Sequence, residues 1–220
     1  MMKLSDIINF YVFTLIILSF NFDYAYCNGK NTFGGINVLT LGNSELHKNC
    51  SLVTVQSIIS NETYVMKARE DSHAVLRDFR SKMGFGRAIA APQIGYSIRM
   101  IAMNICGKEI TLYNPEITHK SDETFTMWDD CLSFPDQMCC VRSHNSISIQ
   151  FIDDNGNNIS WNNCTRDISE LLQHEIDHLN GILATQIAIS PNNLSESIIK
   201  RDDWLANKEL YNSYVDYSIQ

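Results

Sequence analysis

The chain has 220 residues, of which 45% are hydrophobic and 19% are charged, which is enough apolar material for one folded domain with a short tail. Its formal net charge of -8 argues against nucleic acid or an anionic membrane surface as the main partner, because both reward an excess of Lys and Arg. We therefore expect the partner to be a small molecule or a peptide.

The first 27 residues differ from the rest of the chain. Lys3 precedes an apolar stretch over 10–20, and Ala25-Tyr26-Cys27 follows with small residues at its first and third positions. This layout is typical of a secretory signal peptide, and the apolar stretch is short for a membrane span. We expect 1–27 to be a signal peptide, with an uncleaved signal anchor as the alternative, and 28–35 to be a short linker.

The remaining sequence mixes strand and helix patterns. A helix is expected over 72–83, ending at Gly84 and Gly86, and an amphipathic helix over 167–180, ending at Gly181. A tight turn is expected at 154–156, and a last helix within 193–211. Four segments have the Ile-rich or Val-rich, partly alternating composition of strands: 37–41, 98–105, 109–113 and 146–152.

Strands followed by a buried central helix predict an α+β domain, and no linker divides it. We place this domain at 36–200 and a C-terminal helical tail at 201–220. The seven cysteines lack the dense spacing of a disulfide framework, so their pairing stays open.

The strongest chemical pattern is His174-Glu175-Ile176-Asp177-His178 on the expected helix over 167–180. Residues four positions apart lie on one helix face, so both imidazoles can bind a single ion. Glu175, next to the first of them, can carry the proton of an activated water. The alternative is a helix with two incidental histidines, which the complete pattern and the terminating Gly181 disfavour.

A catalytic metal site needs a third protein ligand. One large group of metalloproteases supplies a third His where this chain has Ala184, and other proteases use a downstream Glu, for which Glu196 fits poorly. Cys131 is the upstream candidate, within Trp128-Asp129-Asp130-Cys131-Leu132-Ser133-Phe134-Pro135. A thiolate with two imidazoles suits Fe(II), Zn(II) or Co(II).

A third segment, over 84–95, is rich in Gly and Ala and contains Gln93. Small residues let a backbone approach a substrate closely, and Gln93 can donate a hydrogen bond to a developing oxyanion. Taken alone, such clusters more often serve close packing.

In this order and at these separations, the three segments resemble peptide deformylase, and the resemblance covers roughly 36–189. It includes Val38-Leu39-Thr40-Leu41-Gly42 and Tyr113-Asn114-Pro115-Glu116-Ile117. The resemblance implies an α+β fold with mixed or antiparallel strands around a central His-Glu-x-x-His helix. It also implies removal of formate from N-formylmethionyl peptides with one divalent metal ion, usually Fe(II) and often replaced by Zn(II).

Carried onto this chain, the resemblance implies a metal held by Cys131, His174 and His178. Glu175 would take a proton from the attacking water and pass it to the departing amine, while Gln93 and the backbone N–H of Leu132 would hold the oxyanion. The implied substrate-binding positions are Gly86, Arg87, Ala88, Ile89, Asp130 and Leu171.

Two motifs depart from the usual family pattern. Gly86-Arg87-Ala88-Ile89 replaces Gly-x-Gly-Leu, and Asp129-Asp130 replaces Glu-Gly. Asp130 adds negative charge beside the metal thiolate, and Arg87 lies in the strip that normally pairs with the substrate backbone. We therefore hypothesise that the site binds metal but deformylates ordinary formylmethionyl peptides inefficiently.

Glu170 lies one turn before His174, near the methionine pocket of the family. A carboxylate there either narrows or redirects specificity, or faces solvent, and the second is more common.

Three functions remain in competition. They are a deformylase, a secreted endopeptidase of the His-Glu-x-x-His type, and a deformylase-like protein with an altered substrate or a binding role only. The expected partners are N-formylmethionyl peptides, including nascent chains of an organellar ribosome, with no nucleic acid and no membrane after signal removal. Because formylated chains come from bacterial-type ribosomes, a secretory signal favours delivery to a plastid-like organelle.

Overall fold

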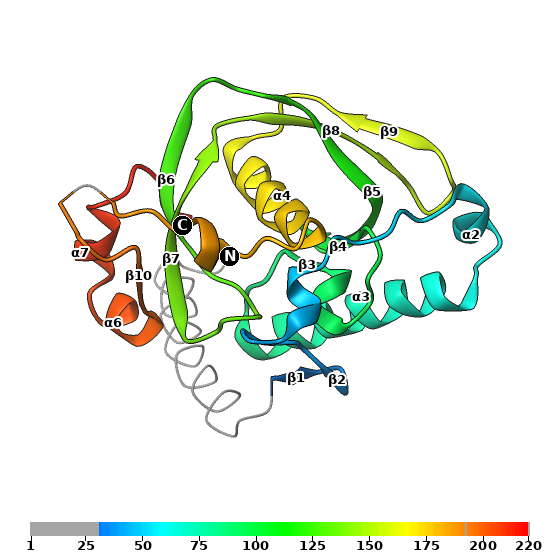
Figure 1. The fold of residues 1–220 in the computed structure, drawn as a ribbon, viewed down its shortest axis with the longest axis horizontal. Coiled ribbons are helices and arrows are strands. Elements are labelled where there is room, and N and C mark those ends of the chain that lie inside the picture. The colour runs from blue at the N-terminus through cyan, green and yellow to red at the C-terminus, as the bar shows by residue number, and fades with distance from the viewer. Residues whose placement is uncertain (1–30, 192, 220) are drawn as a thin grey trace, which may run out of the picture.

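The computed structural model describes residues 31–191 and 193–219, and the predicted signal peptide lies outside these ranges. The described residues form an α+β fold with three antiparallel sheets. Figure 1 shows helix α4 (Arg166–Leu179) at the centre, with curved strands above and beside it and helix α3 (Thr63–Met83) below. No helix within the described ranges is both long enough and apolar enough to cross a bilayer.

The largest sheet has the strand order β3-β4-β5-β8-β9. Its strands are β3 (Ala88–Ala90), β4 (Met100–Ile105), β5 (Lys108–Lys120), β8 (Ile147–Ile152) and β9 (Asn158–Trp161). The strands predicted over 98–105, 109–113 and 146–152 are confirmed, as is the turn at 154–156, which joins β8 to β9. β5 continues beyond the prediction because register shifts between Tyr113 and Glu116 accommodate Pro115.

Helices α3 and α4 pack against opposite sides of β3 and β4. Ala88 and Ala90 belong to the core cluster that contains Leu171 and Leu172 of α4, whereas Ile89 belongs to the cluster that contains Val75 of α3. This alternation follows from the two-residue repeat of a strand. α3 begins at Thr63, earlier than predicted, because its buried face already starts at Val65 and Ala68. A short helix, α2 (Val55–Ile59), precedes it.

A second sheet has the order β10-β7-β6. Its strands are β6 (Thr124–Asp129), β7 (Gln137–His144) and β10 (Ile198–Lys200). The hairpin of β6 and β7 was not predicted, because β6 is buried on both faces and therefore shows no alternation. The loop over 130–136 at the tip of this hairpin carries Cys131.

The strand predicted over 37–41 is wrong. Ile36–Asn37, strand β2, pairs with Thr32–Phe33, strand β1, and the chain then turns away. Beyond β2 the backbone is held by other segments, because Leu39 N donates to Gln93 O (2.7 Å) and Leu41 N donates to Ser133 O (3.0 Å).

The described part of the predicted linker, residues 31–35, belongs to the folded unit. Phe33 is 1% exposed and makes an edge contact with Phe79, with ring centroids 5.1 Å apart. Gly34 N donates to Asp78 Oδ2 (2.7 Å). Residues 31–35 therefore pack on α3 rather than spanning solvent.

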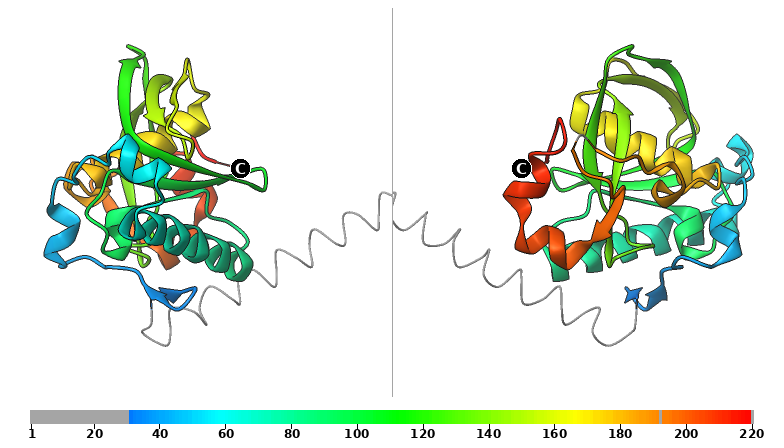
Figure 2. Two further views of the ribbon diagram at one scale, coloured as in Figure 1. Left: turned by 90° about the vertical axis from the view of Figure 1, so that its right-hand side faces the viewer. Right: turned by 60° about the vertical axis from the view of Figure 1, so that its left-hand side comes forward.

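The C-terminal segment contains two short helices, α6 (Arg201–Ala206) and α7 (Lys208–Asn212), instead of the single helix predicted within 193–211. The break lies at Asn207, whose φ of -132° and ψ of 39° are not helical. The segment is not a free tail: Trp128 Nε1 donates to Tyr211 O (2.8 Å) and Thr126 N donates to Asp216 Oδ2 (2.9 Å). Figure 2 shows this segment lying beside the β6–β7 hairpin.

α4 confirms the helix predicted over 167–180 and is followed by Gly181, which has φ +71°. A Cβ at Gly181 would lie 2.6 Å from the carbonyl carbon and oxygen of His47, at the end of the short helix η1 (Ser44–His47). This close approach fixes the end of α4 against η1. Another short helix, α5 (Ala184–Ile187), follows.

We predict that Gly181→Ala lowers the free energy of unfolding by about 3 kcal/mol, because it adds a backbone clash to an unfavourable φ. The matched control is Gly35→Ala, where φ is +76° but no atom lies within 4 Å of the added Cβ. Its cost should be about 1 kcal/mol, from the backbone alone. Urea unfolding of both variants measures the difference, and equal losses would show that the contact with His47 is unimportant.

Candidate metal centre

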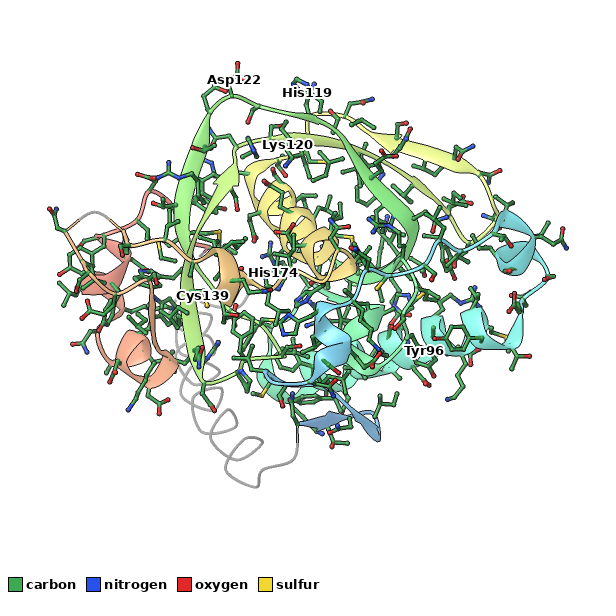
Figure 3. The ribbon with its side chains drawn as sticks, in the orientation of Figure 1. Tyr96, His119, Lys120, Asp122, Cys139 and His174 are labelled. Carbon is green, nitrogen blue, oxygen red and sulfur yellow. The ribbon has the colours of Figure 1, made fainter. Side chains whose placement is uncertain are left out.

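One thiol and two imidazoles converge where the β6–β7 loop meets α4. Cys131 Sγ lies 3.2 Å from His178 Nε2, which lies 3.1 Å from His174 Nε2. The three ligand atoms lie within 4.8 Å of one another. The two histidines share one face of α4 because they are four positions apart, and Figure 3 shows His174 beside the β6–β7 hairpin.

This donor set fits one divalent ion. A tetrahedral ion with bonds of about 2.0 Å to nitrogen and about 2.3 Å to sulfur separates its ligand atoms by somewhat more than 3 Å. The observed separations of 3.1 and 3.2 Å are therefore close to those of ligands that share an ion. Among the described residues the cluster has three ligands, which leaves a position open, as in a catalytic site.

Asp129, the last residue of β6, fixes the orientation of His174. Its Oδ2 lies 2.6 Å from His174 Nδ1, so that Nδ1–H donates to the carboxylate and Nε2 faces the other ligands. Burial disfavours the charged form of His174, but Asp129 outweighs it and raises the pKa of His174 well above its usual value. Burial raises the pKa of Cys131 and lowers that of His178. Asp129 stands where the usual family motif has Glu, so a carboxylate is present at this position in both.

Gln93 lies in the short helix η2 (Ala91–Ile94) and its amide points at the metal ligands. Its Oε1 accepts a hydrogen bond from Ala90 N (2.9 Å), so its Nε2 donates to Cys131 Sγ and Ser133 Oγ, each at 3.2 Å. Leu132 follows Cys131 directly, and its carbonyl accepts from Asn31 Nδ2 (2.9 Å). The structure therefore places the Gln93 amide at the metal ligand Cys131, and Leu132 follows that ligand in the chain, while the oxyanion roles of both stay a prediction.

Glu175 is 4% exposed, and burial raises its pKa to about 7 against the opposing effect of His174. Its Oε2 is buried without a hydrogen-bond partner among the described residues. A carboxyl group with a pKa near neutrality is suited to accept and return a proton at neutral pH.

β3 is an edge strand, since it pairs only with β4 in the sheet. Asn104 N donates to Arg87 O (2.8 Å), and in an antiparallel ladder this directs the backbone of Ala88 away from β4. Ala88 therefore has backbone groups free to pair with an extended peptide, and its substrate-binding role stays a prediction. Ile89 differs: its side chain is fully buried against α3 and its backbone pairs with Ala102, so it does not face the site.

Gly86 and Leu171, two further predicted substrate positions, are closely packed. A Cβ at Gly86 would lie 2.6 Å from the ring of Phe79, so this position requires glycine. Leu171 is 7% exposed and belongs to the core cluster on the α4 side of β3.

Glu170 does not face solvent. It is 4% exposed and forms a short ion pair with Arg87, whose other nitrogen donates to Asp167 O (2.7 Å). Burial raises the pKa of Glu170 to about 7, and Arg87 opposes this rise. A small pocket beside His174 is lined by Glu170 and Gln173, so this ion pair borders the metal centre.

Asp130 is paired as well. Its Oδ2 lies 2.6 Å from Nη1 of Arg201, the first residue of α6. No motif in the sequence marks Arg201, because it lies 71 positions after Asp130 and beyond the stretch that resembles the family. The opposite charges of Arg201 and Asp130 are the sequence feature that could have indicated this contact.

The remaining candidate ligands lie elsewhere. Glu196, the weak protease candidate, is exposed and accepts a hydrogen bond from Ser195 Oγ. Cys139 and Cys140 belong to different core clusters, on opposite faces of β7, so they cannot hold one ion together. Six cysteines in the described ranges carry free thiols: Cys50, Cys106, Cys131, Cys139, Cys140 and Cys164.

Comparison with known proteins gives a consistent result. The sequence model of the polypeptide deformylase family matches residues 36–193. A peptide deformylase of Prochlorococcus marinus is 30% identical over 168 residues, which cover 74% of this chain and 77% of that protein. A peptide deformylase of Desulfotalea psychrophila is 36% identical over 104 residues, and this match spans 60% of that protein.

Solved structures agree with the sequence comparison. A peptide deformylase from Thermotoga maritima superposes with a TM-score of 0.61 at 27% identity, covering 71% of this chain and 98% of that one. A peptide deformylase from Legionella pneumophila gives a TM-score of 0.61 at 27% identity, covering 80% of this chain and 97% of that one. Together with the Cys131, His174 and His178 ligand set, these matches show that the chain belongs to the polypeptide deformylase family.

Proposed function

We propose that this chain is a metal-dependent hydrolase that removes the formyl group from the N-terminal formylmethionine of newly made peptides. The observation that carries the proposal is the convergence of Cys131, His174 and His178 beside Glu175 and Gln93 in a member of this family. Cys131 also argues against the endopeptidase alternative, because it supplies the third ligand that neither position 184 nor Glu196 provides.

The residues divide the reaction between them. A divalent ion, when bound, supplies a Lewis acid that polarises the formyl carbonyl and acidifies water. Gln93 Nε2 and the N–H of Leu132 donate to the oxygen on which negative charge develops, and loss of one such donor typically costs about a hundredfold in rate. Glu175 takes the proton of the attacking water and passes it to the amine of the departing peptide.

We propose Fe(II) as the native metal, with Zn(II) or Co(II) able to replace it. A thiolate and two imidazoles form a donor set that all three ions accept, so the geometry does not choose among them. The choice of Fe(II) rests on the family resemblance. Metal analysis of the protein purified from its native source under exclusion of oxygen tests this assignment.

The two charges that motivated an expectation of low efficiency both have partners. Asp130 faces Arg201, and Arg87 faces Glu170. Paired charges repel or attract a substrate less than isolated ones, so we propose that ordinary formylmethionyl peptides are substrates and that these ion pairs shape the site without blocking it.

We propose that the chain enters the secretory pathway and acts in a plastid-like organelle on nascent chains from its ribosomes. The support is the apolar stretch over 10–20 with the small residues before position 28, together with the origin of formylated chains. Secretion of a full-length tagged protein into the medium would argue against this location.

We predict that the full-length protein, prepared without oxygen and loaded with Fe(II), releases formate from formyl-Met-Ala-Ser. Glu175→Gln should lower the rate by at least about a hundredfold, because it removes the proton carrier, while one equivalent of metal still binds. Glu70→Gln, at an exposed position on α3, is the matched control. One equivalent of bound metal without formate release in the unaltered protein would move the function to another amide or to binding.

We predict that metal stabilises the fold. At a free Zn(II) concentration 100 times the dissociation constant, the free energy of unfolding should rise by about 2.7 kcal/mol. Cys131→Ser should lose most of this gain at the same Zn(II) concentration, and Cys106→Ser, which changes an exposed thiol, should keep it. Urea unfolding with and without chelator gives these values, and an equal gain in both variants would rule out Cys131 as a ligand.

We predict that Arg87→Met lowers the free energy of unfolding by about 2 kcal/mol, because it leaves the buried Glu170 without its partner. The double variant Arg87→Met, Glu170→Gln should recover most of the loss. Arg77→Met, which breaks the more exposed pair with Glu109, should change stability by less than about 0.5 kcal/mol. If the double variant is as unstable as Arg87→Met, the two residues do not act as a pair.

A further inference from the structure

The guanidinium of Arg201 lies against the loop that carries the metal ligand Cys131. It bonds Asp130 Oδ2 at 2.6 Å and approaches Met138 Sδ at 3.7 Å, while Arg201 N donates to Asp136 O (2.9 Å). These contacts reach the start and the end of the 130–136 loop. Arg201 is 8% exposed, so the cation that contacts the loop is almost fully buried.

The same guanidinium also reaches the segment that leads into β3. Its Cζ lies 5.5 Å from the ring centroid of Phe85, within the range of a cation–π contact. Phe85 is held in turn by an edge contact with Phe79 of α3, with centroids 5.2 Å apart. Arg201 therefore joins the two segments that border the metal centre, one carrying Cys131 and the other preceding the edge strand β3.

The backbone of Arg201 has firm support of its own. β10, which directly precedes it, pairs with the first residues of β7 through Lys200 and Gln137, Ile199 and Met138. The remaining C-terminal segment is tied to β6 by the bonds of Trp128 and Thr126 already described. A rigidly held cation can position the loop, whereas one on a mobile tail could not.

The ion pair between Arg201 and Asp130 joins two features in which the chain departs from the family. The family match ends at residue 193, so the segment that supplies Arg201 lies outside it. Asp130, to which Arg201 binds, replaces the Gly that is usual beside the metal ligand. Each change alone is unfavourable: Asp130 alone would place a negative charge beside the Cys131 thiolate, and Arg201 alone would lose its ion pair with Asp130.

We propose that Arg201 is a positioning residue of the metal centre, which through Asp130 and Phe85 fixes Cys131 and the N–H of Leu132 relative to β3. Its contacts with Asp130, Asp136, Met138 and Phe85 involve no metal ligand, so it acts through the loop. The kinetic part of this inference rests on the proposed deformylase function, but the geometry at the metal does not.

The test uses the full-length protein loaded with Co(II), whose thiolate charge-transfer and d–d bands report the geometry at Cys131. The variants are Arg201→Met, Asp130→Gly and the double variant. Lys208→Met is the matched control, because Lys208 is a cation of the same segment that lies over Trp204, 4.7 Å from its ring centroid. Formate release gives kcat and KM for each.

Arg201→Met should shift the Co(II) bands and lower kcat about tenfold. The double variant should restore both, because it puts the usual family residue, Gly, at position 130 and so removes the unpaired carboxylate. Lys208→Met should leave the bands and kcat unchanged. Asp130→Asn, which breaks the charge pair with little change in size, should reproduce the shift if Arg201→Met does not fold.

Unchanged Co(II) bands in folded Arg201→Met or in Asp130→Asn would overturn the proposal, even if stability falls, because a purely structural residue would behave in that way. Failure of the double variant to restore the bands would overturn it too. Shifted and restored bands in a protein that releases no formate would support the positioning role and count against the proposed function alone.

Discussion

The hydrogen bond between Asp129 and His174 joins the two parts of the molecule that form the metal centre. It connects the end of β6 to the middle of α4, at 2.6 Å, in surroundings from which water is largely excluded. It also decides which nitrogen of His174 is presented to a metal, since the Nδ1 proton is committed to the carboxylate. A second set of polar contacts, between His144 at the end of β7 and Ser169 and Gln173 of α4, docks the other end of the hairpin on the same helix.

Several further charges are buried around this bond, and each of them is compensated locally. Glu170 is matched by Arg87, the buried Arg201 is matched by the more exposed Asp130, and Glu175 lies beside His174. Burying a lone carboxylate or guanidinium is costly, so such groups persist only with a partner at close range. Two of the positions at which this chain departs from its family, Arg87 and Asp130, are therefore explained as members of ion pairs.

How much of the structure could be predicted from the sequence depended on the range of the interactions. α4 and its two histidines follow from spacing within one helix, and the three motif segments together indicated Cys131, Gln93 and Glu175 as neighbours. β6 could not be predicted, because its outer face is covered by residues near Tyr211 and Asp216, and a strand buried on both sides has no alternating pattern. The burial of Glu170 and the role of Arg201 likewise depend on partners far away in the chain.

The side chain of Asn31 bonds the carbonyl groups of both Val38 and Leu132, and so connects the start of the described chain to the turn that follows the metal ligand. The position at which the predicted signal peptide is removed therefore bears on the conformation of the 130–136 loop. If the chain is cleaved before Asn31, as the predicted signal peptide implies, the Asn31 side chain still supports the Leu132 carbonyl. Cleavage a few residues beyond Asn31 would keep the metal ligands in the chain but remove the donor to the Leu132 carbonyl, so the position of cleavage would affect the turn beside Cys131.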